Sequence, residues 1–141
     1  MTDTERTTRS VVKERELHHA PEKVWRALTQ KHLMEEWLIK SDFKPEVGHR
    51  FDLEADWGNV SCEVLAVEPH KSLSYSWSAH GLESVVTWTL TETDTGTHLK
   101  MEQSGFGKGQ DQAYHGARAG WEQFLDKLER VVAHLNEDEA R

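Results

Sequence analysis

The sequence predicts an α+β fold in which a curved antiparallel sheet of about six strands wraps round a long C-terminal helix. Three observations predict it. Apolar and polar residues alternate with a period of two between Phe51 and Ser104, and turn residues interrupt this alternation at regular intervals. Apolar residues repeat at spacings of three and four from Gln112 to Leu135. Two short helical patterns follow a first strand near the N-terminus.

The N-terminal part of the chain is expected to form one strand and two short helices. Residues 10–18 are predicted as an irregular first strand. Pro21 followed by Glu22 is typical of a helix start, because proline fits the first helical turn and an acidic side chain favours the positive end of the helix dipole. A second helix is expected from Lys31 to Leu38, with its apolar residues on one face: Leu33, Met34, Trp37 and Leu38.

Five consecutive strands are predicted between Phe51 and Ser104, joined by hairpins near 56–59, 68–71, 79–82 and 93–96. A hairpin with an even number of loop residues pairs positions whose numbers sum to an odd value, so the turns fix which residues share a face. The predicted inward rows contain, in turn, Phe51, Val64, Tyr75, Val86 and Gln103; then Ala66, Leu73, Trp88 and Met101; then Leu53, Cys62, Trp77 and Ser84. The opposite face is polar, so the inward face needs a cover.

The last helix is expected to supply that cover. Its apolar residues form one continuous stripe, which consists of Tyr114, Ala117, Trp121, Phe124, Leu128, Val131 and Leu135. We therefore predict a single domain at residues 9–135, with flexible polar tails at 1–8 and 136–141.

Composition and charge argue against several classes of function. The 141 residues carry 17 Lys and Arg against 25 Asp and Glu, a net charge of −8, which argues against nucleic acid or an anionic membrane as a partner. No apolar run is long enough to span a membrane. The first ten residues lack the apolar segment of a secretory signal, and Cys62 is the sole cysteine, so we expect a cytoplasmic location without disulfides.

No metal or other cofactor is expected. Apart from His18 and His19, no two histidines lie closer than ten positions, which excludes the short spacings of common zinc motifs. The glycine-rich segment 105–110 lies between a strand and a helix, but it ends in Gln and no βαβ unit surrounds it, so it does not match a dinucleotide fingerprint. Cys62 faces inward in mid-strand, where a structural thiol is expected.

The inward face itself is the candidate site. Tyr75 and Gln103 place polar atoms there, and buried polar atoms need partners that a ligand or water can supply. The last helix begins with small residues that include Gly116 and Gly120, although glycine in a helix costs about 1 kcal/mol relative to alanine. A short connection should hold this half of the helix over Gln103. We predict a cavity there, with the loop 105–109 at its rim; a plain packed core is the alternative.

Several segments together resemble a known family. They are Ala20-Pro21-x-x-Val24-Trp25-x-Ala27-Leu28-Thr29, Leu33-x-x-x-Trp37, Glu63-Val64-Leu65-x-Val67-Glu68-Pro69-x-x-x-Leu73-x-Tyr75-x-Trp77, Ser84-x-Val86-Thr87-Trp88-x-Leu90, Gly96-Thr97-x-Leu99, Ser104-Gly105-Phe106 and Gly120-Trp121. With these motifs, about residues 9–135 resemble the homologues of the activator of heat-shock-protein-90 ATPase, within the START-like SRPBCC superfamily. Lys13 stands where the family usually has Val or Ile, which leaves the register of the first strand open.

This resemblance implies the helix-grip fold and an elongated cavity between the sheet and the long helix that binds apolar small molecules. It implies no shared catalytic residues. The co-chaperones after which the family is named carry an additional N-terminal domain with no counterpart in these residues, which argues against direct stimulation of a chaperone ATPase.

The preferred interpretation is a module that binds a small hydrophobic molecule, aromatic or lipid-like, without catalysis. Tyr75 and Gln103 are expected to act as polar tethers and the tryptophans as walls. The candidate ligand contacts are Trp37, Phe51, Val64, Tyr75, Trp77, Val86, Trp88, Met101, Gln103, Phe106, Gly116, Gly120, Trp121 and Phe124.

Two other functions stay open. The first is a chaperone-interaction domain that acts like an activator of the heat-shock-protein-90 ATPase. The second is an enzyme for a polyketide-like substrate, for which the inward face offers Tyr75 but no clear acid or base partner. The protein partners left open are a chaperone and a second copy of this chain.

Overall fold

The computed structural model describes residues 9–39, 41–55, 58–79 and 81–135. The predicted tails at 1–8 and 136–141 lie outside these described residues, and the domain bounds of 9–135 stay a prediction. None of the helices in the described part of the chain has the length and apolar character that a membrane span needs.

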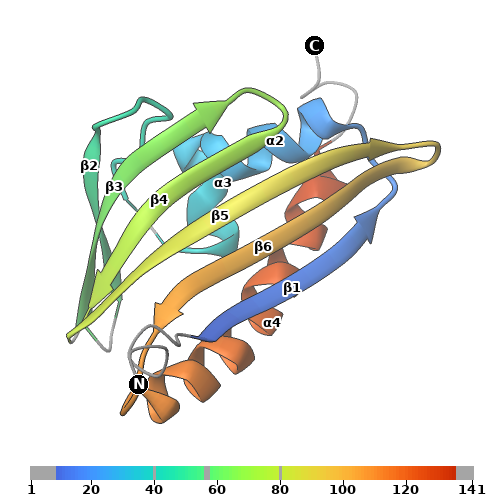
Figure 1. Ribbon diagram of the computed structural model, residues 1–141. Coiled ribbons are helices and arrows are strands. Elements are labelled where there is room, and N and C mark those ends of the chain that lie inside the picture. The colour runs from blue at the N-terminus through green and yellow to red at the C-terminus, as the bar shows by residue number, and fades with distance from the viewer. Residues whose placement is uncertain (1–8, 40, 56–57, 80, 136–141) are drawn as a thin grey trace.

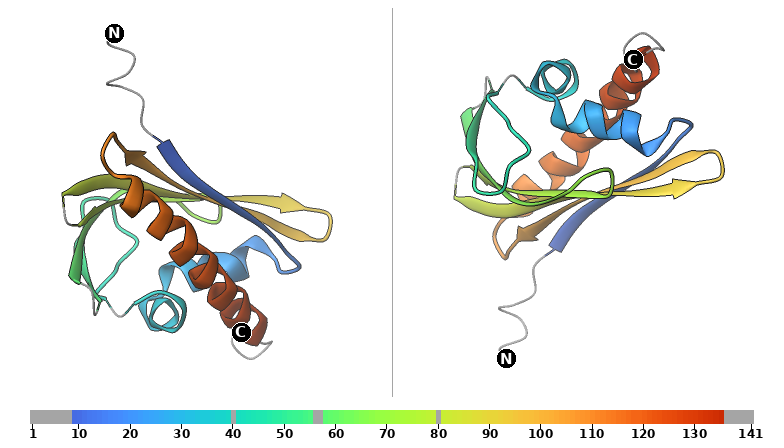
Figure 2. Two further views of the ribbon diagram at one scale, coloured as in Figure 1. Left: turned by 90° about the horizontal axis from the view of Figure 1, so that it is seen from below. Right: turned by 90° about the horizontal axis from the view of Figure 1, so that it is seen from above.

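An antiparallel six-stranded sheet with a long helix across one face confirms the predicted α+β, helix-grip architecture (Figure 1). The strand order is β1-β6-β5-β4-β3-β2. The strands are β1 (Arg9–Leu17), β2 (Arg50–Ala55), β3 (Gly58–Glu68), β4 (Ser72–Ala79), β5 (Leu82–Thr93) and β6 (Gly96–Phe106). The helices are α2 (Pro21–Thr29), α3 (Lys31–Trp37) and α4 (Asp111–His134), and Figure 2 shows all of them on the same side of the sheet.

The two short helices follow the sequence prediction closely. Pro21 occupies the first turn of α2, where its missing N–H costs no helical hydrogen bond. The indole Nε1 of Trp37 donates a hydrogen bond to the carbonyl oxygen of Ala27 at 2.8 Å, which joins α3 to α2. Leu38, predicted as the last residue of the second helix, is its C-cap. Together α2 and α3 cover the part of the sheet that α4 leaves open (Figure 2).

The predicted pairing holds through the centre of the sheet. Val64, Tyr75, Val86 and Gln103 lie opposite one another across β3, β4, β5 and β6, and each is at most 1% exposed. The edge strand β2 differs from the prediction by two residues, since Phe51 pairs with Cys62 and not with Val64. A slip of two residues keeps every side chain on its predicted face.

One inward assignment is wrong, that of Ala66. A three-residue turn joins Glu68 to Ser72, and an odd turn reverses the parity on which the assignment depended. A β-bulge between Val64 and Ala66 restores that parity further along the strand. Ala66 is therefore exposed, and Val67 packs against the core in its place.

The buried stripe of α4 is wider than the sequence analysis predicts. It includes Leu125 and Val132, which the predicted spacing leaves out, together with Trp121, Leu128 and Val131. Phe124 and Tyr114 are only partly buried. The reason is geometric: on a helix of 3.6 residues per turn, residues 121, 125, 128 and 132 centre on a line turned by roughly 40° about the helix axis from the line on which residues 117, 121 and 124 centre. The helix therefore faces the core along a different line from the predicted one.

The register of β1, which the sequence leaves open, places two cationic side chains toward α4. Lys13 and Arg15 lie on the inward face of β1, between the buried Val11 and Leu17. The Nζ of Lys13 lies 2.8 Å from a carboxylate oxygen of Glu122. The guanidinium of Arg15 contacts three carboxylates of α4, those of Glu122, Asp126 and Glu129. Charged side chains take the place of apolar ones on the inward face of β1 because α4 presents carboxylates to that face.

We expect Arg15→Met to lower the free energy of unfolding by about 1 kcal/mol, because several half-buried carboxylates lose their common partner. The difference should shrink as salt is added, since screening weakens the lost attraction. Urea denaturation at low and high ionic strength measures both effects. Arg50→Met is the control, because Arg50 is 83% exposed and makes one long ion pair, with Glu63. An equal loss in both variants would contradict the assigned role of Arg15.

Candidate functional site

A cavity of about 380 Å³ lies between the first half of α4 and strands β4 to β6. The sheet contributes Trp77 and Ala79 from β4, Leu82 from β5 and Gln103 from β6. The helix contributes its small residues and two aromatic ones: Ala113, Gly116, Ala117, Gly120, Trp121 and Phe124. This hollow lies at the polar end of the inward face, where the sequence analysis expects a cavity.

The two helical glycines of this lining are not there for close packing. A Cβ added to Gly116 or Gly120 would meet no heavy atom within 4 Å, so neither position lies against a neighbour that only glycine could accommodate. Both have ordinary helical backbone, so no left-handed conformation demands glycine either. Each glycine lowers helix stability by about 1 kcal/mol relative to alanine. What the two residues provide is space beside the sheet.

Aromatic rings form the wall of the cavity. The ring centroids of Trp77 and Trp121 lie 5.3 Å apart, and those of Trp121 and Phe124 lie 5.4 Å apart. Trp88 packs behind Trp121, at 5.7 Å in an edge-on arrangement, and is fully buried. The wall thus consists of rings that other rings hold in place, and an aromatic wall suits a flat apolar molecule.

Gln103 is the polar side chain of the lining, and it is 1% exposed. Its Oε1 accepts a hydrogen bond from the indole Nε1 of Trp121 at 2.7 Å. Its Nε2 donates to the Oγ of Ser84 at 2.9 Å. Ser84 in turn donates to the carbonyl oxygen of Trp77 at 2.8 Å. This chain of hydrogen bonds joins β4, β5, β6 and α4 behind the cavity.

The structure separates the predicted contacts into two groups. Six of them line the cavity: Trp77, Gln103, Gly116, Gly120, Trp121 and Phe124. The other eight are at most 3% exposed and pack in the core away from the cavity lining: Trp37, Phe51, Val64, Tyr75, Val86, Trp88, Met101 and Phe106. The hydroxyl of Tyr75 accepts a hydrogen bond from Trp88 Nε1 at 2.9 Å, so its polar group already has a partner within the core.

Ala113 and Ala117 of α4 line the cavity but are absent from the predicted contacts. Ala79 and Leu82 of the sheet are absent from them as well. They pair with each other across the β4–β5 hairpin. The parity rule that places Trp77 and Ser84 inward also places these two inward, so the signal was available in the sequence.

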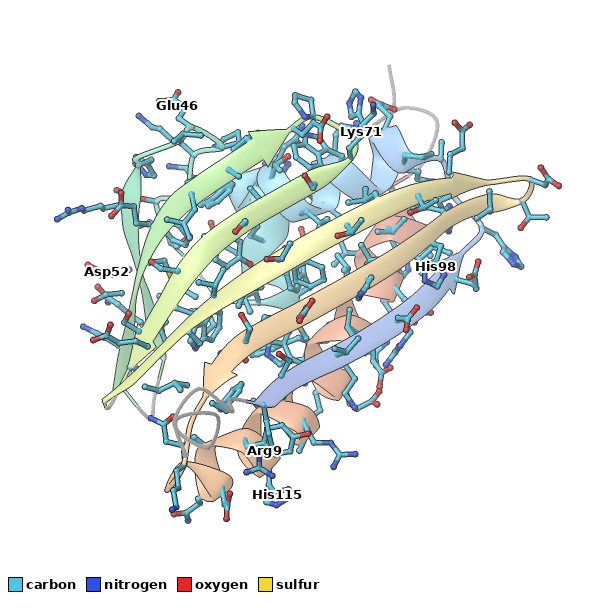
Figure 3. The ribbon with its side chains drawn as sticks, viewed as in Figure 1. Arg9, Glu46, Asp52, Lys71, His98 and His115 are labelled. Carbon is cyan, nitrogen blue, oxygen red and sulfur yellow. The ribbon has the colours of Figure 1, made fainter. Side chains whose placement is uncertain are left out.

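The loop between β6 and α4 connects the two sides of the cavity at one end. The Oε1 of Gln110 accepts a hydrogen bond from the backbone N–H of Gly107 at 2.7 Å. Its Nε2 donates to the carbonyl oxygen of Gly81 at 3.4 Å, in the turn that precedes Leu82. In Figure 3, Arg9 and His115 lie together at this end of α4, and Arg9 stacks on the ring of Tyr114 at 4.0 Å. The predicted rim is thus held by a few polar contacts.

Titratable groups elsewhere do not converge on the cavity. Burial raises the pKa of the Cys62 thiol to about 12, which keeps it protonated. His98 lies on the outward face of the sheet (Figure 3), where hydrogen bonds to Glu16 and Glu14 raise its pKa. Within the described part of the chain, no group of three His, Cys, Asp or Glu residues could hold a metal ion.

A wider depression of about 870 Å³ lies over β2 and β3. Charged side chains of both signs line it, among them Lys31, Arg50, Asp52 and Glu54. Asp52 projects outward from the edge of the sheet (Figure 3), and Arg50 is 83% exposed. About half of this surface is polar, whereas the lining of the smaller aromatic cavity is mainly apolar, so the smaller cavity is the better candidate site for an apolar ligand.

Comparisons with known proteins agree with the fold. Residues 18–133 match the model of a family described as "Activator of Hsp90 ATPase homolog 1-like protein". The crystal structure of protein MLL2253 from Mesorhizobium loti is similar, with 61% sequence identity over 91% of this chain and 99% of that chain, at a TM-score of 0.87. No curated protein matches the chain.

Two further solved structures resemble the chain at lower identity. CalU16 from Micromonospora echinospora has 28% identity over 90% of this chain and 78% of that chain, at a TM-score of 0.79. DynU16, a protein of the dynemicin biosynthetic locus, has 26% identity over 89% of this chain and 47% of that longer chain, at a TM-score of 0.80.

Proposed function

This chain belongs to the Activator of Hsp90 ATPase homolog 1-like family, and from that premise we propose that it binds a small, largely apolar aromatic molecule in the cavity between α4 and the sheet. The ligand lies against Trp77, Trp121 and Phe124. The glycine-containing face of α4 leaves the room that it occupies.

The observation that carries this proposal is the unused space over Gly116 and Gly120. Two helical glycines with nothing near their Cβ positions reduce helix stability without improving packing. The volume of about 380 Å³ lies at the lower end of the range of about 300–1,000 Å³ for small-molecule pockets. A residue choice that weakens the fold and keeps a pocket open is expected where the pocket has a use.

The chemistry of the lining favours binding over catalysis. Among the described residues that line the cavity, none is titratable. Tyr75 has a pKa raised by burial, and its hydroxyl is engaged by Trp88 outside the lining. General acid–base catalysis needs a proton donor or acceptor within reach of the substrate. The proposal therefore contains binding and no chemical step.

One relative supports a small organic molecule as the ligand. DynU16 is a protein of the dynemicin biosynthetic locus, and the chain matches about half of it. A carrier or sequestering protein for an aromatic compound would suit such a setting, and the apolar cavity described above would suit such a compound.

The proposal is tested by titrating the protein with naphthalene and, separately, with a fatty alcohol while amide NMR spectra are recorded. Naphthalene is expected to shift the resonances of Trp77, Gln103 and residues 116–121, while those on the outward face of the sheet, such as Thr87, stay in place. The fatty alcohol should act more weakly, because a flexible chain loses more conformational entropy on binding than a rigid ring. A well-dispersed spectrum that no aromatic compound perturbs would contradict the proposed function.

A further inference from the structure

The orientation of the Gln103 side chain is fixed by its neighbours. An indole N–H is a donor only, so the atom of Gln103 that faces Trp121 Nε1 at 2.7 Å is the oxygen. The amide nitrogen then faces Ser84 Oγ, at 2.9 Å. Because Ser84 accepts this hydrogen bond, its own hydrogen goes to the carbonyl oxygen of Trp77. Each donor and acceptor in this chain therefore has one possible direction.

One of the two amide N–H groups of Gln103 has no acceptor in this chain of hydrogen bonds. An amide nitrogen carries two hydrogens, and within the described residues Ser84 Oγ is the single acceptor that Nε2 has. The side chain is 1% exposed and belongs to the lining of the cavity. Buried N–H groups without an acceptor are rarer in proteins than carbonyl oxygens with a free lone pair. The second N–H of Gln103 is therefore the polar group that a ligand is best placed to satisfy.

The lining also restricts the charge of a ligand. Its members within the described part of the chain are aromatic, aliphatic or glycine apart from Gln103, and none carries a charge. An ionised ligand would lose its hydration without gaining an opposite charge, which is strongly unfavourable. A neutral ligand with a single accepting oxygen avoids that loss and fills the one open hydrogen bond.

We propose that the cavity selects uncharged aromatic molecules that carry one accepting oxygen, such as an aryl ketone, and that this oxygen accepts the second N–H of Gln103. This inference rests on the proposed function, and it adds the chemical class of the ligand. Trp121 acts as the positioning residue: its Nε1 hydrogen bond fixes the oxygen of the Gln103 amide, and its ring forms part of the cavity wall.

A matched set of three compounds tests the inference: acetylnaphthalene, its isosteric hydrocarbon isopropenylnaphthalene and the anion naphthoate, all substituted at the same ring carbon. Calorimetric titration of the wild-type chain is expected to give the highest affinity for the ketone, a lower affinity for the hydrocarbon and the lowest for the anion. In Gln103→Leu the ratio of ketone to hydrocarbon affinity should fall about ten-fold, the size of one good hydrogen bond. Glu102→Leu, on the outward face of the same strand, is the control and should keep the wild-type ratio.

A second measurement does not depend on the variant's folding. In the wild-type spectrum, the side-chain N–H₂ resonances of Gln103 should move downfield with the ketone and much less with the hydrocarbon. Equal affinities for ketone and hydrocarbon, with the Gln103 resonances unmoved, would overturn the inference and leave the proposed function standing. Preferential binding of naphthoate would also overturn it. Binding of none of the three compounds would overturn the proposed function and this inference together.

Discussion

Gly120→Leu is expected to weaken binding of an aromatic ligand by at least about 100-fold while the protein stays folded. A leucine at this position projects its side chain into the cavity of about 380 Å³ between α4 and the sheet, beside Trp77 and Trp121. The ligand and the leucine would then compete for the same space. To bind, the ligand would have to push the leucine side chain out into water, which costs about 2–3 kcal/mol of lost apolar burial. The ligand would also lose part of its own contact with the aromatic rings.

The same substitution is expected to stabilise the fold. A Cβ at position 120 meets no atom within 4 Å, so nothing has to move to accept it. Leucine is a better helix former than glycine by close to 1 kcal/mol, and its side chain buries apolar area in a cavity that is already lined by apolar groups. We expect the free energy of unfolding to rise by about 1–2 kcal/mol. A variant that gains stability and loses binding would identify the space over Gly120 as functional.

Urea denaturation and calorimetric titration with a naphthalene compound measure the two effects. The matched control is Ala119→Leu, which places the same side chain on the exposed face of the same helix. It should leave binding unchanged. Wild-type affinity in Gly120→Leu would place the ligand elsewhere on the molecule, and a loss of stability would show that the space over α4 is smaller than described.

Trp88→Ala is expected to lower the free energy of unfolding by about 3–5 kcal/mol, a large share of the 5–15 kcal/mol that a domain typically has. Trp88 is fully buried at the centre of the sheet. Its ring packs edge-on against Trp37 from α3 and Trp121 from α4, at centroid distances of 5.6 and 5.7 Å. One side chain thus joins the sheet to two helices, and its removal leaves a cavity that none of them can close.

A hydrogen bond adds to this loss. The indole Nε1 of Trp88 donates to the hydroxyl of Tyr75 at 2.9 Å, and both groups are buried. Trp88→Ala leaves that hydroxyl without its donor. Tyr75→Phe removes only the hydroxyl, and it should lower the free energy of unfolding by about 1–3 kcal/mol, because a buried N–H is then left unpaired.

Chemical denaturation measures the free energy of unfolding of both variants. The control is Thr87→Ala, because Thr87 is the neighbour of Trp88 on the opposite face of β5. Its free energy of unfolding should stay within about 1 kcal/mol of that of the wild type. A loss of less than about 1 kcal/mol in Trp88→Ala would contradict the role given to this ring. Because Trp88 lies behind the cavity wall, reduced binding in this variant is expected to follow from lost stability and from movement of Trp121.

The faces of the sheet could be predicted well from the sequence, because side chains alternate strictly along a strand and turn length fixes the pairing. Val86 and Gln103 are opposite each other as the turn arithmetic requires. Ala66 is the exception, and its cause is a three-residue turn compensated by a bulge. Neither feature has a strong signature in the sequence, since both depend on backbone angles such as the positive φ of 67° at His70.

The candidate site could be predicted in part. The small residues of α4 and the polar Gln103 indicate a cavity in the sequence, and these residues border one hollow in the structure. The same reasoning cannot predict that Trp77 lines the cavity and that Trp88 does not. Both are inward tryptophans on adjacent strands, with nearly the same burial. Both rings contact Trp121 of α4, but Trp88 also packs against Trp37 of α3, whereas Trp77 lines the cavity beside the small residues of α4. That difference depends on how the helices are placed over the sheet.

The sequence by itself thus determined the elements, the inward face of the sheet and the small-residue half of α4. These features depend on the periods of strand and helix, which each segment carries within itself. Only the tertiary structure decided which inward residues line the cavity, why Lys13 and Arg15 face α4, and how Gln103 is oriented by Trp121 and Ser84. Those features depend on distances between segments far apart in the chain, and periodicity contains no information about such distances.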